Sequence, residues 1–149
     1  DEYVSFVNAP QQVEKLGIKV TQNSDAAFKG YSSALKVWIR GKDNKAFSIG
    51  GTVFDETMQR LSLINEFYFE VEPQGHFIII ENNDMPGVIG DVGTYLGKSG
   101  INIGSFDLSR NRSGGKAMAL IRVDSELSDK NLKELSSIKN VLSAKLVSL

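Results

Sequence analysis

Alternating apolar and polar positions run through the first half of the chain and predict β-strands. Two hairpins are expected, the first with strands at 35–40 and 46–49 and the second with strands at 60–64 and 67–71. Shorter strands are expected at 3–7, 18–21 and 52–54. Gly50 and Gly51 interrupt the pattern just before residue 52. One short helix is predicted, with Asn8 as its N-cap, Pro10 in its first turn and Gly17 at its end.

The second half of the chain has a simpler order of elements. Residues 77–80 form a continuous apolar run, which is typical of a strand buried on both faces. Helical spacing begins at Val88 and ends at Ser99, and a second helix is predicted from its cap Ser128 to Ser137. The remaining strands are predicted at 101–108, 117–123 and 141–147.

This order, βαββαβ, predicts an antiparallel sheet with both helices on one face. The fold class is therefore α+β, a β-rich region followed by a ferredoxin-like domain. Pro73 to Gly75 break the pattern, and we place the domain boundary there, giving domains 1–73 and 74–149. Because the other face of the second sheet and its edges are expected to be uncovered, we expect this domain to dimerise.

Composition excludes several function classes. The 149 residues carry 17 basic and 18 acidic side chains, which argues against nucleic acid as a partner. The absence of cysteine excludes thiol nucleophiles and zinc–thiolate sites, and a single histidine leaves little for metal or triad chemistry. No apolar run approaches the roughly 18 residues of a membrane span. We therefore expect no catalytic residues, no metal and no membrane partner, and the start at Asp1 suggests a fragment.

The loop after residues 77–80 carries the most informative chemistry. Asn82 and Asp84 directly precede a helix start at Pro86–Gly87–Val88, whose unpaired N–H groups attract anions. A carboxylate beside such a helix start complements both charges of a free amino acid. Asn102 is expected at the same end of the sheet, where its amide can donate and accept. The alternative is that Asp84 and Asn82 only stabilise a turn and cap the helix.

Other candidate positions are less specific. The predicted helix after Pro86 contains three glycines, which are unfavourable inside a helix: Gly90, Gly93 and Gly97. They indicate either close approach by another backbone or a ligand, or tight packing on the sheet. Arg60 beside Gly50 and Gly51 forms a candidate anion or phosphate site, with solvated strand faces as the alternative. Trp38 and the aromatic run 67–69 are expected in the core. The chain has no G-x-G-x-x-G and no P-loop, so no nucleotide site is predicted.

Two sets of residues resemble a known family. Residues 75–80, 84–90 and 100–103, which read GHFIII, DMPGVIG and GINI, closely resemble an ACT domain, and in particular that of the D-3-phosphoglycerate dehydrogenases. Residues 7–10, 50–54 and 64–65 resemble the intervening, or allosteric substrate-binding, domain of the long form of that enzyme, here truncated at its N-terminal side. Residues 141–146 also fit, so the resemblance covers essentially the whole chain.

The resemblance implies a regulatory part of an oxidoreductase of L-serine biosynthesis. The parent enzyme oxidises 3-phosphoglycerate with NAD in the cytoplasm, and this fragment holds no cofactor of its own. L-serine would bind as effector at Asn82, Asp84, Pro86, Gly87, Val88 and Asn102, between two ACT domains. Some relatives have an aromatic residue or histidine near the position of Asn82. The family's basic position before the turn at 64–65 falls on Arg60, where it would contact a phosphate-bearing substrate or another anion. Homo-oligomers would form through both domains.

Three alternatives remain. The β subunit of L-serine dehydratase combines similar domains. A purely structural ACT module would dimerise whether or not a ligand is bound. An acylphosphatase-like enzyme on the same fold needs an anion-binding arginine in the loop after the first strand, where this chain has an acidic sequence instead.

Overall fold

The computed structural model describes residues 4–24, 31 and 33–149, and the chain forms two compact units, residues 1–31 and 32–149. In the first unit the predicted helix is confirmed as α1 (Ala9–Lys15), with Pro10 in its first turn. Asn8 precedes the helix but its side chain does not cap it. Its Oδ1 accepts instead from the backbone N–H of Ser5, at 2.7 Å.

The two short strands expected in the first unit are wrong over the described residues. Residues 4–7 lead through a turn into α1, and residues 18–21 have no strand partner. The backbone N–H of Ala9 donates to the oxygen of Ser5, so local turn bonds satisfy groups that a strand would have to pair across a ladder. Tyr3 lies outside the described residues.

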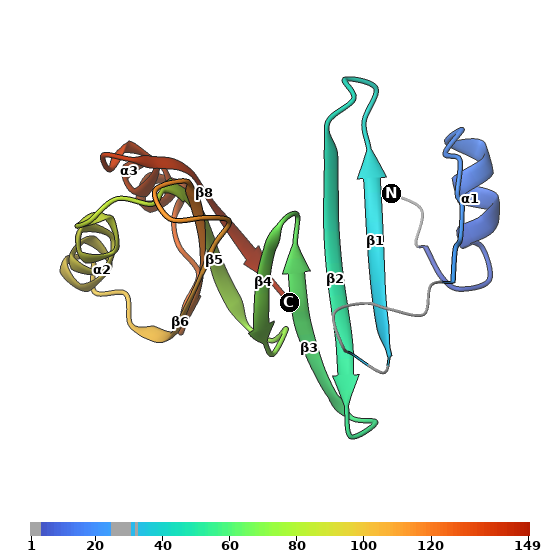
Figure 1. The fold of residues 1–149 in the computed structure, drawn as a ribbon, viewed down its shortest axis with the longest axis horizontal. Helices are drawn as coiled ribbons and strands as arrows, with labels where there is room; N and C mark the ends of the chain where they lie inside the picture. Colours follow the sequence, from blue (N-terminus) through green and yellow to red (C-terminus); the bar gives the residue numbers. More distant parts are fainter. Residues whose placement is uncertain (1–3, 25–30, 32) are drawn as a thin grey trace. The chain divides into compact units, whose positions relative to one another are not determined.

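The first sheet of the second unit confirms both predicted hairpins (Figure 1). Its antiparallel order is β1-β2-β3-β4, with bounds β1 Ala34–Arg40, β2 Ala46–Phe54, β3 Met58–Ile64 and β4 Phe67–Val71. The expected interruption at Gly50–Gly51 is wrong, because β2 runs through both glycines and only shifts its register with β3 there. A β-bulge absorbs the extra residue without ending the strand.

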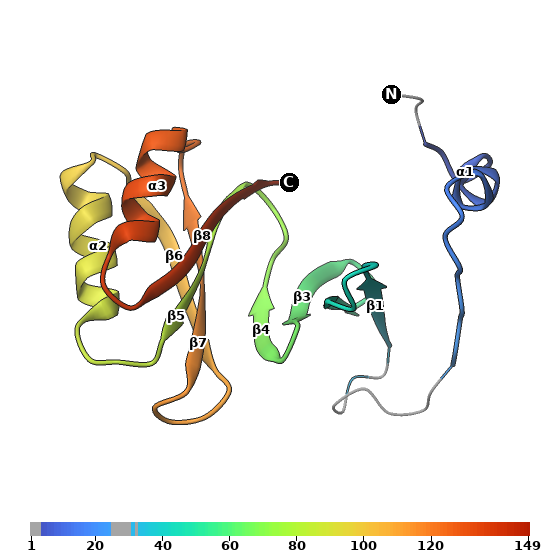
Figure 2. The same cartoon turned by 90° about the horizontal axis from the view of Figure 1, so that it is seen from above.

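The second sheet confirms the predicted βαββαβ domain. Its order is β6-β7-β5-β8, all antiparallel, with bounds β5 His76–Asn83, α2 Val88–Lys98, β6 Ile103–Arg110, β7 Lys116–Val123, α3 Asp129–Ser137 and β8 Val141–Ser148. Ser128 caps α3 as predicted, accepting from the N–H of Asn131. Figure 2 shows α2 and α3 together on one side of this sheet.

Strand β5 is buried on both faces, as its apolar run predicts. Ile78 and Ile80 belong to the core under α2 and α3. Phe77 and Ile79 belong to a second core, which β4 completes. The expected uncovered face of the second sheet is therefore wrong in part: β4 lies on the side opposite the helices and covers β5 and β7, while Lys145 and Val147 of β8 stay exposed on that side (Figure 2).

The second core explains the aromatic run of β4. Phe67 and Phe69 are at most 6% exposed and pack against Met118 and Leu120 of β7, so their predicted core role is confirmed. Tyr68 between them is 43% exposed, so its predicted core role is wrong, because alternate side chains of a strand point to opposite faces. Trp38 is different, being 63% exposed on β1, with the ammonium of Lys36 lying 5.3 Å from its ring centroid. Its predicted core role is wrong, because β1 is the edge strand farthest from β4 in the first sheet.

Replacing Phe69 with alanine tests whether β4 is part of the second sheet's core. We expect Phe69→Ala to lower the free energy of unfolding by about 3–5 kcal/mol, because it opens a cavity in a packed core. Phe47→Ala is the matched control on the same sheet, where the ring is 46% exposed, and should change stability by less than about 1 kcal/mol. Urea unfolding of the 149-residue chain measures both, and equal effects would contradict the packing described here.

Candidate functional site

The loop between β5 and α2, residues 84–87, holds the predicted carboxylate in place. The side chain of Asp84 is 19% exposed, and its Oδ2 accepts from Nη1 of Arg110, at 3.4 Å, and from the backbone N–H of Gly114, at 3.2 Å. The backbone N–H of Asp84 donates to the oxygen of Gly115. Both side-chain contacts described for this carboxylate use Oδ2, which leaves the lone pairs of Oδ1 for another partner.

Asn82 lies at the end of β5 with its side chain inside the protein. The residue is 2% exposed, continuing the alternation of Ile78 and Ile80. Its Nδ2 donates to the backbone oxygen of Asn83, while its Oδ1 has no hydrogen-bond partner among the described residues. A buried acceptor without a partner costs about 1–3 kcal/mol, so Asn82 gains from any donor that reaches it.

The predicted helix start is confirmed at Gly87 and Val88. Gly87 is the N-cap with φ +94°, a left-handed conformation that a side chain disfavours. It has no side chain to cap the helix, and the Val88 N–H makes only a long bond, to the oxygen of Met85 at 3.5 Å, so the start of α2 can receive an anionic group. Pro86 precedes this cap, and Asp91 is the acidic residue of the first turn.

Asn102 lies at the opposite end of the sheet from Asn82, so its predicted position is wrong. Strand β6 begins at Ile103, which pairs with Val123, and Val123 pairs with His76 at the start of β5. Asn82 is six residues further along β5, about 20 Å at strand rise. Helix α2 carries the chain from the end of β5 back to the end of the sheet where β5 began. The sequence alone does not show this direction. The Asn102 amide donates to the carboxylate of Asp124.

The glycines of α2 do not pack against the protein. A Cβ built at Gly90, Gly93 or Gly97 meets no atom within 4 Å, so tight packing on the sheet does not explain them. They follow one another at spacings of three and four residues, which places them on one face of the helix. The residues of α2 that are buried against the sheet are Val88, Val92 and Leu96.

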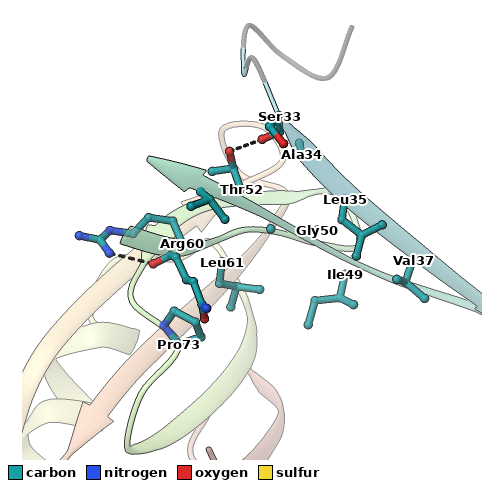
Figure 3. Close-up of a pocket in the computed structure, with 13 residues that line it drawn as sticks. Ser33, Ala34, Leu35, Val37, Ile49, Gly50, Thr52, Arg60, Leu61 and Pro73 are labelled. Carbon is teal, nitrogen blue, oxygen red and sulfur yellow. Dashed lines mark hydrogen bonds between the residues drawn. The ribbon is translucent and has the colours of Figure 1, made fainter. Parts of the chain in front are cut away.

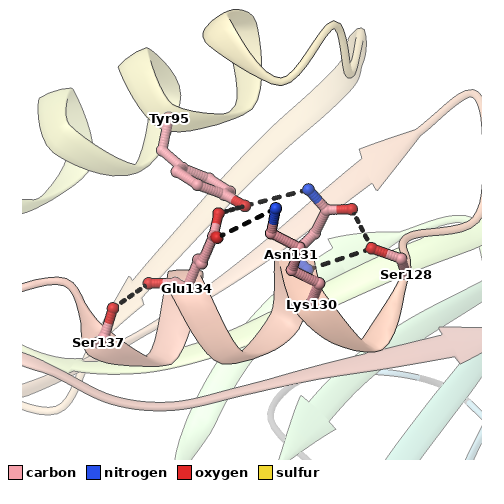
Figure 4. A network of polar contacts seen from close by, with 6 residues as sticks. All are labelled: Tyr95, Ser128, Lys130, Asn131, Glu134 and Ser137. Carbon is pink, nitrogen blue, oxygen red and sulfur yellow. Dashed lines mark hydrogen bonds and ion pairs between the residues drawn. The ribbon is translucent and has the colours of Figure 1, made fainter.

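A polar network joins α2 to α3 (Figure 4). The hydroxyl of Tyr95 donates to Oε2 of Glu134, at 2.9 Å, and accepts from Nδ2 of Asn131, at 3.0 Å. The hydroxyl of Ser128 donates to Oδ1 of the same asparagine, which connects the α3 cap to the network. The sequence does not indicate this contact, because only the packing of two helices brings Tyr95 to Glu134.

Lys116 and Glu81 form a close ion pair between neighbouring strands β7 and β5. Their Nζ and Oε1 atoms are 2.6 Å apart. The hydrogen bond that Lys116 donates to Glu81, together with the negative charge of Glu81, raises the pKa of Lys116 above its ordinary value, and Glu66 adds a smaller effect in the same direction. This pair, like Arg110, was missed from the sequence, because β-strand register decides which charges meet.

The first sheet contains a pocket of about 420 Å³ at the predicted anion site (Figure 3). Gly50, Gly51 and Arg60 all line it, so the structure brings these three residues together. The other lining side chains are mostly apolar, among them Leu35, Val37, Ile49, Val53, Leu61 and Pro73. The guanidinium of Arg60 donates to the backbone oxygen of Gln59, at 2.8 Å. The lining therefore suits an apolar group better than a phosphate.

The described part of the chain contains neither a metal-binding cluster nor a membrane-spanning helix. No group of three or more histidine, aspartate or glutamate side chains is arranged to hold a metal ion. No helix has the length and hydrophobicity needed to cross a lipid bilayer.

Comparison with known proteins finds one family match in the region of each sheet. Residues 1–65 match the D-3-phosphoglycerate dehydrogenase intervening domain, and residues 76–140 match the ACT domain. The chain therefore contains one region similar to each of these two domains. Strands β1–β3 lie within the first match, and the β5–α2 loop and hairpin 111–115 lie within the second.

Individual relatives agree with both matches. The chain is 33% identical to D-3-phosphoglycerate dehydrogenase of Bacillus subtilis over all of its residues, which is 28% of that relative. It is 30% identical to the enzymes of Synechocystis, with 99% of the chain and 26% of the relative covered, and of Archaeoglobus fulgidus, with 98% and 28% covered. The chain thus spans roughly a quarter of the length of these dehydrogenases.

Removing the Tyr95 hydroxyl tests the network between the helices. Tyr95→Phe deletes two hydrogen bonds and leaves the oxygen of Glu134 and the amide of Asn131 without their partner. We expect the free energy of unfolding to fall by about 0.5–1.5 kcal/mol for each bond, because these groups are only partly exposed. Urea denaturation followed by circular dichroism measures the change. An unaltered midpoint would show that the two helices do not depend on this contact.

Removing the charge of Glu81 tests the cause of the raised Lys116 pKa. Glu81→Gln should move that pKa down toward its ordinary value, and Glu66→Gln should lower it less. Because the folded-state pKa is raised, the pair stabilises the fold fully below the unfolded pKa, and this contribution is lost as pH rises through the folded one. Side-chain NMR titration reads the pKa directly. If Glu66→Gln lowered the pKa of Lys116 more than Glu81→Gln does, Glu66 and not Glu81 would be the main cause of the raised pKa.

Proposed function

We propose that the chain is the regulatory part of an NAD-dependent D-3-phosphoglycerate dehydrogenase of L-serine biosynthesis, with an intervening domain at 1–73 and an ACT domain at 74–149. The main support is that the intervening-domain match is followed along the chain by the ACT-domain match. Relatives named D-3-phosphoglycerate dehydrogenase also align with nearly all of the chain. The effector proposed is L-serine. Catalysis with NAD belongs to the rest of such an enzyme, in the cytoplasm.

The chemistry of the β5–α2 loop supports an amino acid as ligand. Oδ1 of Asp84 can accept the ammonium group, and the uncapped first turn of α2 can receive the carboxylate. The unpartnered Oδ1 of Asn82 lies two residues before Asp84 and adds a buried acceptor for a second donor. The loop therefore offers complementary groups for both ends of a small zwitterion.

The position of Asn102 supports a ligand site shared by two copies. One copy separates Asn102 from the β5–α2 loop by most of a strand length, far beyond the size of serine. Two copies related by a two-fold axis perpendicular to their strands run their sheets in opposite directions, which would bring the loop end of one beside the Asn102 end of the other. Homo-oligomerisation through this domain is accordingly part of the proposal.

Calorimetric titration of the chain with L-serine tests the proposal, with D-serine as the stereochemical control. We expect binding at millimolar or lower concentration, and Asp84→Asn should weaken it by about tenfold or more, equivalent to about 1.4 kcal/mol. Asp91→Asn is the matched control, since it removes a carboxylate beside the same helix start without touching the loop. Asn102→Ala should weaken binding as well.

Sedimentation of the same samples decides between a ligand site and a purely structural dimer. The proposal predicts that L-serine shifts the association equilibrium, because the ligand contacts both copies. Dimerisation that is identical with and without serine, together with no heat of binding at millimolar serine, would reject the effector role and leave a structural module.

A further inference from the structure

The hairpin between β6 and β7, with its tip at residues 111–115, contacts the β5–α2 loop on one side. Arg110, the last residue of β6, and the N–H of Gly114 both donate to Oδ2 of Asp84. The backbone oxygen of Gly115 accepts from the Asp84 N–H at 2.9 Å. Three contacts from one hairpin thus hold Asp84, two at its carboxylate and one at its backbone, at the centre of the proposed ligand site.

The same hairpin contacts the first sheet on its other side. Nδ2 of Asn111 donates to Oε1 of Glu66, in the turn between β3 and β4, at 3.3 Å. The hydroxyl oxygen of Ser109 accepts from the backbone N–H of Tyr68 in β4, at 3.0 Å. Met118 of β7 extends this contact into the apolar core shared with β4. Loop and sheet are therefore joined through one short segment.

Hydrogen bonds within the hairpin tip hold its two sides together. Oδ1 of Asn111 accepts from the Lys116 N–H across the tip, and the N–H of Gly115 donates to the oxygen of Arg112. A Cβ at Gly115 would lie 3.2 Å from that same backbone oxygen and 2.5 Å from Oδ1 of Asn111, so only glycine closes the tip this tightly. These contacts fix the conformation of the tip between Asp84 and Glu66.

We propose that the β6–β7 hairpin couples the β5–α2 loop to the turn between β3 and β4, with Arg110 as the positioning residue that links Asp84 to the hairpin. The effect of serine on this coupling rests on the proposed function. The coupling between the loop and the turn does not. An ammonium bound at Oδ1 of Asp84 shares the negative charge of the carboxylate and so weakens the contact between Oδ2 and Arg110. Release of Arg110 then loosens the hairpin against Glu66 and Tyr68, which gives two states with different affinity for the ligand.

Amide hydrogen exchange of the ¹⁵N-labelled chain, measured by NMR without ligand, tests the coupling. Arg110→Ala should speed exchange at the Tyr68 amide by about tenfold, while Arg110→Lys, which keeps the charge, should restore much of the protection. Arg112→Ala is the matched control, because it removes a cation of the same hairpin for which the described residues provide no ion pair. Amides of Leu96 and Ile121, in the core under the helices, report any general loss of stability.

Faster exchange at Tyr68 confined to Arg110→Ala, with Leu96 and Ile121 unchanged, supports the coupling. Equal Tyr68 rates in Arg110→Ala and Arg112→Ala overturn it, and so does faster exchange at Ile121 that matches Tyr68, since that would make Arg110 merely stabilising. These comparisons need no ligand, so they decide the coupling even where titration shows that serine does not bind. Where serine binds, its addition should shift the Tyr68 signal in the wild type and not in Arg110→Ala.

Discussion

Two-sided burial of β5 is the constraint on which the arrangement of residues 32–149 depends. Ile78 and Ile80 face α2 and α3, while Phe77 faces the aromatic side chains of β4. A strand with apolar side chains on both faces must be covered on both, because burial of apolar surface is the main favourable term in folding. The helices of the ACT domain cover one face and a hairpin of the first sheet covers the other. The two sheets consequently share a core.

The shared core has consequences for the polar groups around it. With β4 packed on the second sheet, the β3–β4 turn comes within hydrogen-bond distance of the β6–β7 hairpin, and Glu66 meets Asn111. The same hairpin holds Asp84, the residue on which the proposed serine site depends. Apolar packing thus determines which polar side chains are neighbours. In the proposed coupling, those neighbours connect a ligand at the β5–α2 loop to the turn between β3 and β4.

The outer part of the first sheet behaves differently. Leu35, Val37 and Ile49 are each more than 40% exposed around the apolar pocket, far more than the aromatic residues of β4. This gradient follows distance from the second sheet across the order β4-β3-β2-β1. Arg60 lies beside the pocket with its guanidinium bonded to its own backbone neighbour, so the surroundings are those of an apolar surface rather than a phosphate site.

The sequence by itself determined the elements whose signals are local. The apolar run before Ile80, the cap at Ser128 and the helix start at Gly87 each depend on residues a few positions apart, and all were predicted. Asp84 was likewise recognised, because a carboxylate before a helix start is visible in the sequence. Short segments such as residues 4–7 were mistaken for strands, because a strand forms only where a partner strand supplies its hydrogen bonds.

Only the tertiary structure decided which distant residues meet. The direction of α2 places Asn102 at the far end of the sheet from Asn82, and strand pairing brings Lys116 to Glu81. Arg110 and the Tyr95 network were found only in the folded chain, for the same reason. Local patterns fix the conformation of a segment because its interactions span a few residues. The partners of a side chain depend on how segments pack, and that is a property of the whole fold.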